Sequence, residues 1–166
     1  ENGCMIREAC PDDWAVWREL RLRSLHEDPQ AFASSVTAWT GVRDTEANWR
    51  ERLASDGVCL IAYVDDHPVG MAGGMPVADG IELISMWVAP EARGKGAGRA
   101  LVDGVLAWAA DQGANAPLQQ GSDSPSIRLR VMDGNGSAIV LYEKCGFVLE
   151  PGCPDAEGCR AMTHSP

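Results

Sequence analysis

The stretch that decides the fold is residues 81–110, IELISMWVAPEARGKGAGRALVDGVLAWAA. It opens with an apolar run, 81–88, whose residue types are typical of a strand. It closes with residues 100–110, in which apolar side chains recur at helical spacing. The segment between them holds glycine at every second position from Gly94 to Gly98. The sequence therefore predicts a strand, a glycine-rich turn and a helix in direct succession.

The glycine-rich turn is predicted to bind phosphate. Glycines leave its backbone N–H groups open to close approach, and the start of the next helix adds further free N–H groups. Arg93, Lys95 and Arg99 bring local positive charge to a chain whose net charge is −10. Because Arg99 stands where a dinucleotide fingerprint needs its third glycine, that motif is excluded, and no P-loop is present. The spacing that this segment does match is [RQ]-x-x-G-x-[GA], at Arg93, Gly96 and Gly98. The alternative is a plain glycine-rich loop that caps a helix.

A second pattern lies about forty residues further on, where residues 135–147 read NGSAIVLYEKCGF. Asn135 is suited to cap a helix, and Gly146 permits a left-handed exit from it. Ala138, Leu141 and Tyr142 are spaced to share one helical face. A capped amphipathic helix explains this apolar spacing, but not the tyrosine, lysine and glycine together.

Together, the two patterns resemble the coenzyme A-binding motifs of the GNAT acetyltransferase superfamily. The close resemblance covers about residues 81–149, and the N-terminal third agrees only in the order of its elements. It implies an α/β (α+β) fold with a mixed, mostly antiparallel sheet of six to seven strands and about four flanking helices. At 166 residues we expect one domain. Its parts would be acceptor-side helices and a hairpin in 1–80, the acetyl-CoA-binding motifs in 81–149, and a tail or strand in 150–166.

The function implied by the resemblance is transfer of an acetyl group from acetyl-CoA to a primary amine, without a metal. The acceptor would be a small molecule or a protein N-terminus or lysine, attacking directly through a tetrahedral intermediate. The turn's amides would hold the pyrophosphate, and the backbone of the preceding strand would pair with the pantetheine arm beside a splay in the sheet. The coenzyme-binding residues expected are Met86, Val88, Arg93, Gly94, Lys95, Gly96, Ala97, Gly98, Arg99, Asn135, Ala138, Tyr142 and Lys144.

Two catalytic residues are expected. By the resemblance, Tyr142 would protonate the departing coenzyme A sulfur; the alternative is that its ring only packs. Glu82 could accept the amine's proton, and strand alternation predicts that it shares a face with Ile84 and Met86. A strand-end acid facing solvent explains Glu82 almost as well. Cys145 needs no chemical role, because direct transfer forms no covalent enzyme intermediate.

The other expected elements follow from periodicity and turn residues. They are a helix over 12–25, a helix from about Asp44, a hairpin of 58–64 and 69–77, a strand at 127–132, a helix at 136–144 and strands at 147–149 and near 159–162. Residues 111–126 look like a long flexible connection. Acceptor recognition would fall to residues 26–45 and 75–80, with Phe32, Trp39, Glu27, Asp28 and Asp44 as candidates for a pocket that binds a cationic amine.

Composition limits the function classes further. A net charge of −10 argues against a nucleic-acid partner and would attract cationic ones. The six cysteines form no CxxC pair, and those placed in apolar runs, such as Cys59, are interpreted as small core residues of a cytoplasmic protein. No apolar run is long enough for a membrane span. A homodimer is possible. The competing functional hypothesis is a coenzyme A-binding sensor or interaction module without turnover.

Overall fold

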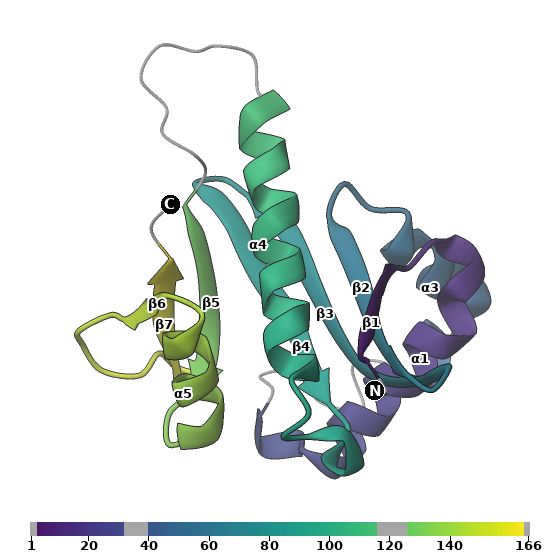
Figure 1. Cartoon of the computed structure of the whole chain (residues 1–166), viewed down its shortest axis with the longest axis horizontal. Helices are drawn as coiled ribbons and strands as arrows, with labels where there is room; N and C mark the ends of the chain where they lie inside the picture. The colour runs from purple at the N-terminus through teal and green to yellow at the C-terminus, as the bar shows by residue number, and fades with distance from the viewer. Residues whose placement is uncertain (1–2, 32–39, 116–125, 165–166) are drawn as a thin grey trace.

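Seven strands form one sheet in the computed structural model, which describes residues 3–31, 40–115 and 126–164. The spatial order is β1-β2-β3-β4-β5-β7-β6, and every neighbouring pair is antiparallel except β4 and β5, which are parallel. This mixed, mostly antiparallel sheet confirms the predicted fold class (Figure 1). The strands are β1 Met5–Glu8, β2 Val58–Val64, β3 His67–Val77, β4 Gly80–Val88, β5 Ile127–Met132, β6 Phe147–Leu149 and β7 Cys159–His164.

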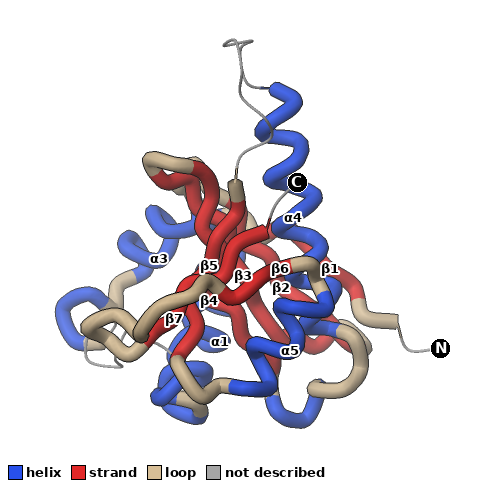
Figure 2. The backbone as a smooth tube through the Cα atoms, turned by 90° about the vertical axis from the view of Figure 1, so that its left-hand side faces the viewer, coloured by secondary structure: helices blue, strands red, loops and turns tan. Residues whose placement is uncertain are grey.

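Helices cover both faces of the sheet, as Figure 2 shows from the side. The four α-helices of the described residues are α1 Trp14–Glu27, α3 Glu46–Leu53, α4 Ala97–Asn115 and α5 Gly136–Lys144. Short 3₁₀ turns lie at Pro11–Asp13 (η1), Pro29–Ala31 (η2), Gly41–Arg43 (η3) and Pro90–Ala92 (η4). Successive side chains of β2 point to opposite faces of the sheet, and each face packs against its own layer of helices. Leu60 packs in the cluster that holds Leu101 of α4, whereas Ile61 packs with Trp17 of α1 and Trp49 of α3.

The expected element boundaries need three corrections. Strand β1 was not predicted, because three of its four residues are exposed at the sheet edge and show no apolar alternation. Helix α4 continues to Asn115, so the first part of the predicted connection 111–126 is helical, and 116–125 lies outside the described residues. Helix α1 spans Trp14–Glu27 instead of 12–25, because Pro11–Asp13 form the 3₁₀ turn η1.

Strand β4 carries a bulge that changes which side chains share a face. Gly73 of β3 pairs with Ile84 and Met71 with Trp87, so the two residues between them on β4 face one residue of β3. Ser85, within the bulge, has a φ of 55°. As a result Met86 packs in the core beside α4, while Trp87 packs in the core beside α1 and α3. The prediction that Glu82 shares a face with Met86 is therefore wrong, since simple alternation does not survive the extra residue.

The parallel seam between β4 and β5 is short. Only Ile81 to Leu83 of β4 pair with Ile127 to Leu129 of β5. Beyond Leu83, β4 continues through the bulge without further pairing to β5, while β5 keeps its pairing with β7 to Met132. The splay expected beside this strand is thus present in the sheet.

Candidate active site

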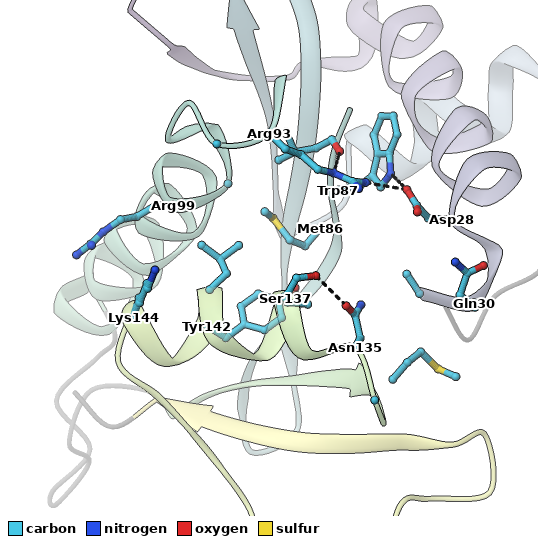
Figure 3. Close-up of a pocket in the computed structure, with 18 of the residues that line it drawn as sticks. Asp28, Gln30, Met86, Trp87, Arg93, Arg99, Asn135, Ser137, Tyr142 and Lys144 are labelled. Carbon is cyan, nitrogen blue, oxygen red and sulfur yellow. Dashed lines mark hydrogen bonds and ion pairs between the residues drawn. The ribbon is translucent and has the colours of Figure 1, made fainter. Parts of the chain in front are cut away.

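A cleft of about 1000 Å³ opens where β4 and β5 separate (Figure 3). The end of β4, the glycine-rich turn, the first turn of α4, the end of β5 and helix α5 surround it, and η2 closes one side. Its side chains come from segments far apart in the sequence. The cleft forms because β4 and β5 stop pairing after Leu83 and Leu129.

Backbone geometry explains the glycines of the turn. Gly94 and Gly96 have φ values of 78° and 84°, in the left-handed region that favours glycine, and a Cβ on either would meet only open space. Gly98 differs, because its Cβ would lie 3.1 Å from Leu141 Cδ2, so its glycine lets α4 approach α5. The first helical hydrogen bond runs from the Ala100 N–H to the Gly96 carbonyl at 3.0 Å. The preceding amides of the helix start, 97–99, are left without helical acceptors beside the cleft.

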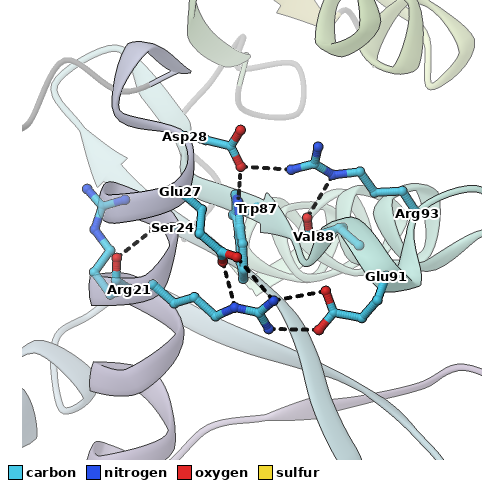
Figure 4. Close-up of polar contacts among 9 residues, drawn as sticks. Arg21, Ser24, Glu27, Asp28, Trp87, Val88, Glu91 and Arg93 are labelled. Carbon is cyan, nitrogen blue, oxygen red and sulfur yellow. Dashed lines mark hydrogen bonds and ion pairs between the residues drawn. The ribbon is translucent and has the colours of Figure 1, made fainter.

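Arg93 holds the turn in place (Figure 4). Its Nε donates to the Val88 carbonyl at 2.9 Å, and its Nη2 donates to Asp28 Oδ2 at 2.8 Å. Through these two bonds the Arg93 guanidinium binds other groups of the protein. The side chains of Lys95 and Arg99 are exposed. Of the three cations of the motif, Arg93 therefore fixes the backbone, and Arg99 pairs with Asp103 one helical turn away at 3.7 Å.

Tyr142 of α5 is 7% exposed and lines the cleft. Its ring meets Phe147 edge-on, with centroids 6.0 Å apart. Burial, with a smaller contribution from Cys145, raises the pKa of the Tyr142 hydroxyl well above its usual value, so the hydroxyl stays protonated. The hydroxyl makes no hydrogen bond to another described residue, which leaves it available as a donor.

Most of the predicted coenzyme-binding residues come together in this cleft. Eleven of the thirteen line it; Lys95 and Ala97 do not. Asn135 stands at the start of α5, but its side chain makes no capping bond and instead accepts from Ser137 Oγ at 3.4 Å. Gly146, with a φ of 96°, ends the helix as expected. The motifs did not indicate the lining residues Asp28, Gln30, Ala31, Trp87, Met132, Asp133, Gly134 and Ser137.

Glu82 lies apart from this group. It lines a second cavity, of about 470 Å³, with Arg128 and the 150–155 part of the β6–β7 loop. Arg128 and Arg130 of β5 are exposed, while the alternate residues of that strand pack in the core beside α4. The second cavity therefore lies on the opposite face of the sheet from the cleft. Tyr142 and Glu82 are on the two sides of the β4–β5 seam.

Sequence comparison decides the family. The family model described as "Acetyltransferase (GNAT) family" matches residues 22–147.

The chain belongs to the GNAT acetyltransferase family.

Relatives agree with that membership. The chain is 33% identical over 130 residues to human N-acetyltransferase 8, an alignment that covers 74% of this chain. It spans about half, 52%, of that curated relative's length. The resemblance that the two motifs predicted is therefore confirmed at the level of the family.

Solved GNAT structures share the fold. The PaiA N-acetyltransferase of Thermoplasma acidophilum, in complex with coenzyme A, aligns at a TM-score of 0.74 and 18% identity over 99% of both chains. The putative acetyltransferase YncA of Salmonella typhimurium, with acetyl-CoA, aligns at 0.73 and 20% over 97% of this chain and 92% of its own. The ribosomal-protein-S18-alanine N-acetyltransferase of Escherichia coli aligns at 0.66 and 18% over 98% and 93%.

The acids proposed to attract a cationic amine are already engaged in this GNAT chain. Glu27 forms an ion pair with Arg23, and Asp44 binds Arg18 and the indole of Trp49. Asp28 lines the cleft, but accepts from Trp87 and Arg93. Phe32 and Trp39 lie outside the described residues. All three acids are therefore paired within the fold, and of the three only Asp28 lines the cleft. Separately, no helix within the described ranges has the length and apolar character to cross a membrane.

Proposed function

We propose that this chain is an acetyl-CoA-dependent N-acetyltransferase that acetylates a primary amine. The observation that carries the proposal is that the free amides at the start of α4 and the Tyr142 hydroxyl open into one cleft beside the β4–β5 seam. An anion-binding helix start suits the pyrophosphate of the coenzyme, and a protonated donor suits its thioester sulfur. Membership of the GNAT family supports the same activity.

The glycine-rich turn is the proposed site for the coenzyme's pyrophosphate. The open space at Gly94 and Gly96 would let phosphate oxygens reach the backbone, and the helix dipole favours negative charge there. Lys95, Arg99 and Lys144 are exposed around this end of the cleft and would add charge. The backbone groups of Met86 and Val88, on the part of β4 not paired with β5, would bind the pantetheine arm.

Acetyl-CoA supplies an acetyl group activated as a thioester. The neutral amine's lone pair forms a bond to the carbonyl carbon, and the carbon–sulfur bond breaks with its electrons leaving on sulfur. Tyr142 would donate its hydroxyl proton to that sulfur and recover one from solvent. Glu82, which faces the other side of the seam, would accept the amine's proton directly or through water.

The competing hypothesis is a coenzyme A-binding module without turnover. Release of coenzyme A thiol with a panel of amines, combined with calorimetry of acetyl-CoA binding, separates the two. An enzyme releases thiol in step with a one-acetyl mass increase on the amine. Tight binding without thiol release on any amine would favour the module, and no binding would refute both.

A further inference from the structure

The second cavity, on the face of the sheet opposite the coenzyme cleft, is lined by residues of opposite charge. Glu82 of β4 and Arg128 of β5 are direct partners in the parallel pairing, so their side chains leave neighbouring strands on the same face. Arg130, the first β5 residue beyond that short pairing, also lines the cavity. The cavity thus lies where β4 and β5 begin to separate.

Some of the charged side chains around this cavity have hydrogen-bond or ion-pair partners, and others have none among the described residues. Arg130 pairs with Asp155 and Glu157 at 2.6 Å each, which ties the β6–β7 loop to the sheet. Arg160 donates to the Glu150 carbonyl at 3.2 Å. Glu82 and Arg128, in contrast, form no side-chain hydrogen bond or ion pair with each other or with any residue that the structure describes.

A second cation lies further along the same face. Arg52 Nη2 would be 3.3 Å from a Cβ on Gly73, beside the Ile84 side chain, and has no hydrogen-bond partner among the described residues. The Arg52 Nη1 donates to the Cys59 thiol at 3.5 Å. Burial and the nearby Arg52 guanidinium lower the pKa of Arg21 to about 10. Arg52 is therefore a second cation on the same face as the Glu82–Arg128 cavity.

These observations favour a ligand that carries both charges. A guanidinium matches a carboxylate in geometry and charge, and a carboxylate such as Glu82 matches an ammonium group. We propose that the Glu82–Arg128 cavity binds the acceptor, and that the acceptor is an amino acid, whose carboxylate is bound by Arg128 and whose amine faces Glu82. This inference rests on the proposed acetyltransferase function. It distinguishes a free amino acid from a polyamine, which lacks the carboxylate, and from a peptide N-terminus, where an amide replaces it.

The test compares the common amino acids with their carboxamides, together with spermidine and a short peptide, in the thiol-release assay. The carboxamide's amine is less basic, so a larger fraction is neutral and unaided chemistry favours the carboxamide. We expect the wild-type chain to prefer a free acid by roughly 10- to 100-fold in kcat/KM, the range expected from one charged hydrogen bond. Arg128→Gln should remove this preference by raising KM for the acid far more than KM for the carboxamide, and Arg128→Lys should partly restore the preference.

Arg7→Gln is the matched control, because it removes the same charge from β1 at the far edge of the sheet and should keep the preference. Turnover of spermidine, peptide or carboxamide in preference to the acids would overturn the inference and leave the acetyltransferase proposal standing. An acid preference that survives in Arg128→Gln would also overturn it. Amino-acid binding to the coenzyme A-loaded chain, seen by calorimetry without turnover and lost in Arg128→Gln, would support the site and refute the acetyltransferase. Neither binding nor turnover would overturn both.

Discussion

Asp28 and Arg93 join the segment after α1 to the glycine-rich turn through one carboxylate oxygen. Asp28 Oδ2 accepts from Arg93 Nη2 at 2.8 Å and from the Trp87 indole Nε1 at 2.7 Å. Because Arg93 also holds the Val88 carbonyl, the bulged end of β4, the turn and the end of α1 form one connected group (Figure 4). The acceptor-side segment is thereby coupled to the coenzyme-binding turn.

Asp28→Ala should loosen the turn and destabilise the chain. The change removes two hydrogen bonds, one of them between charged groups, so we expect a loss of about 1–3 kcal/mol. In a chain of this size that corresponds to a thermal midpoint lowered by about 2–4 °C per kcal/mol. Calorimetric affinity for acetyl-CoA should fall in the same variant. Glu27→Ala, which removes the neighbouring carboxylate that pairs with Arg23, should leave acetyl-CoA affinity unchanged; equal affinity in both variants would contradict the coupling.

Gly96→Asp should weaken acetyl-CoA binding far more than Lys95→Ala. The substitution introduces a carboxylate where a phosphate is proposed to bind, and like charges placed together cost several kcal/mol. It also forces a side chain onto a residue with a φ of 84°. Lys95→Ala removes only one exposed charge, so its effect should be small at moderate salt. Isothermal calorimetry with both variants checks this, and comparable affinities would refute the phosphate site.

Tyr142→Phe should lose kcat by about 10²–10⁴-fold while its affinity for acetyl-CoA barely changes. The ring and its edge-on contact with Phe147 are kept, and only the proton donor is removed. Because burial raises the pKa of Tyr142, the wild-type rate should show no loss from tyrosine ionisation up to about pH 10. Steady-state rates and the thermal midpoint are measured together. A fully active Tyr142→Phe variant would rule out the acid role, and the ring would then serve packing alone.

Asp44 should make the chain sensitive to acid. Hydrogen bonds from Arg18 and from the Trp49 indole lower the pKa of Asp44 to about 2. A carboxyl whose pKa is lower in the folded chain stabilises the fold above its unfolded pKa, near 4, and this stabilisation is lost as the pH falls towards 2. The urea midpoint of the wild type should therefore fall more steeply over this window than that of Asp44→Asn. Asp66→Asn, in the β2–β3 turn, should follow the wild type; identical slopes in all three would contradict the assignment.

Local patterns in the sequence determined a large part of this protein. The run 81–110 and the motif 135–147 gave the strand, turn and helices that form the cleft, because glycine conformations and apolar periodicity act over a few residues. Those same motifs identified eleven of the residues that line the cleft. The resemblance to the family was visible in these motifs without any tertiary contact, and the match to the family model over residues 22–147 confirmed it.

Only the tertiary structure decided the rest, because it depends on residues that are distant in the chain. The bulge at Ser85 reverses the side-chain alternation of β4 and separates Met86 from Glu82, which no periodic pattern announces. The union of Asp28 with Arg93 brings together residues 65 positions apart. That Glu82 and Arg128 have no partner among the residues that the structure describes is likewise visible only once β4 lies beside β5, because a charge is paired or unpaired through space and not along the sequence.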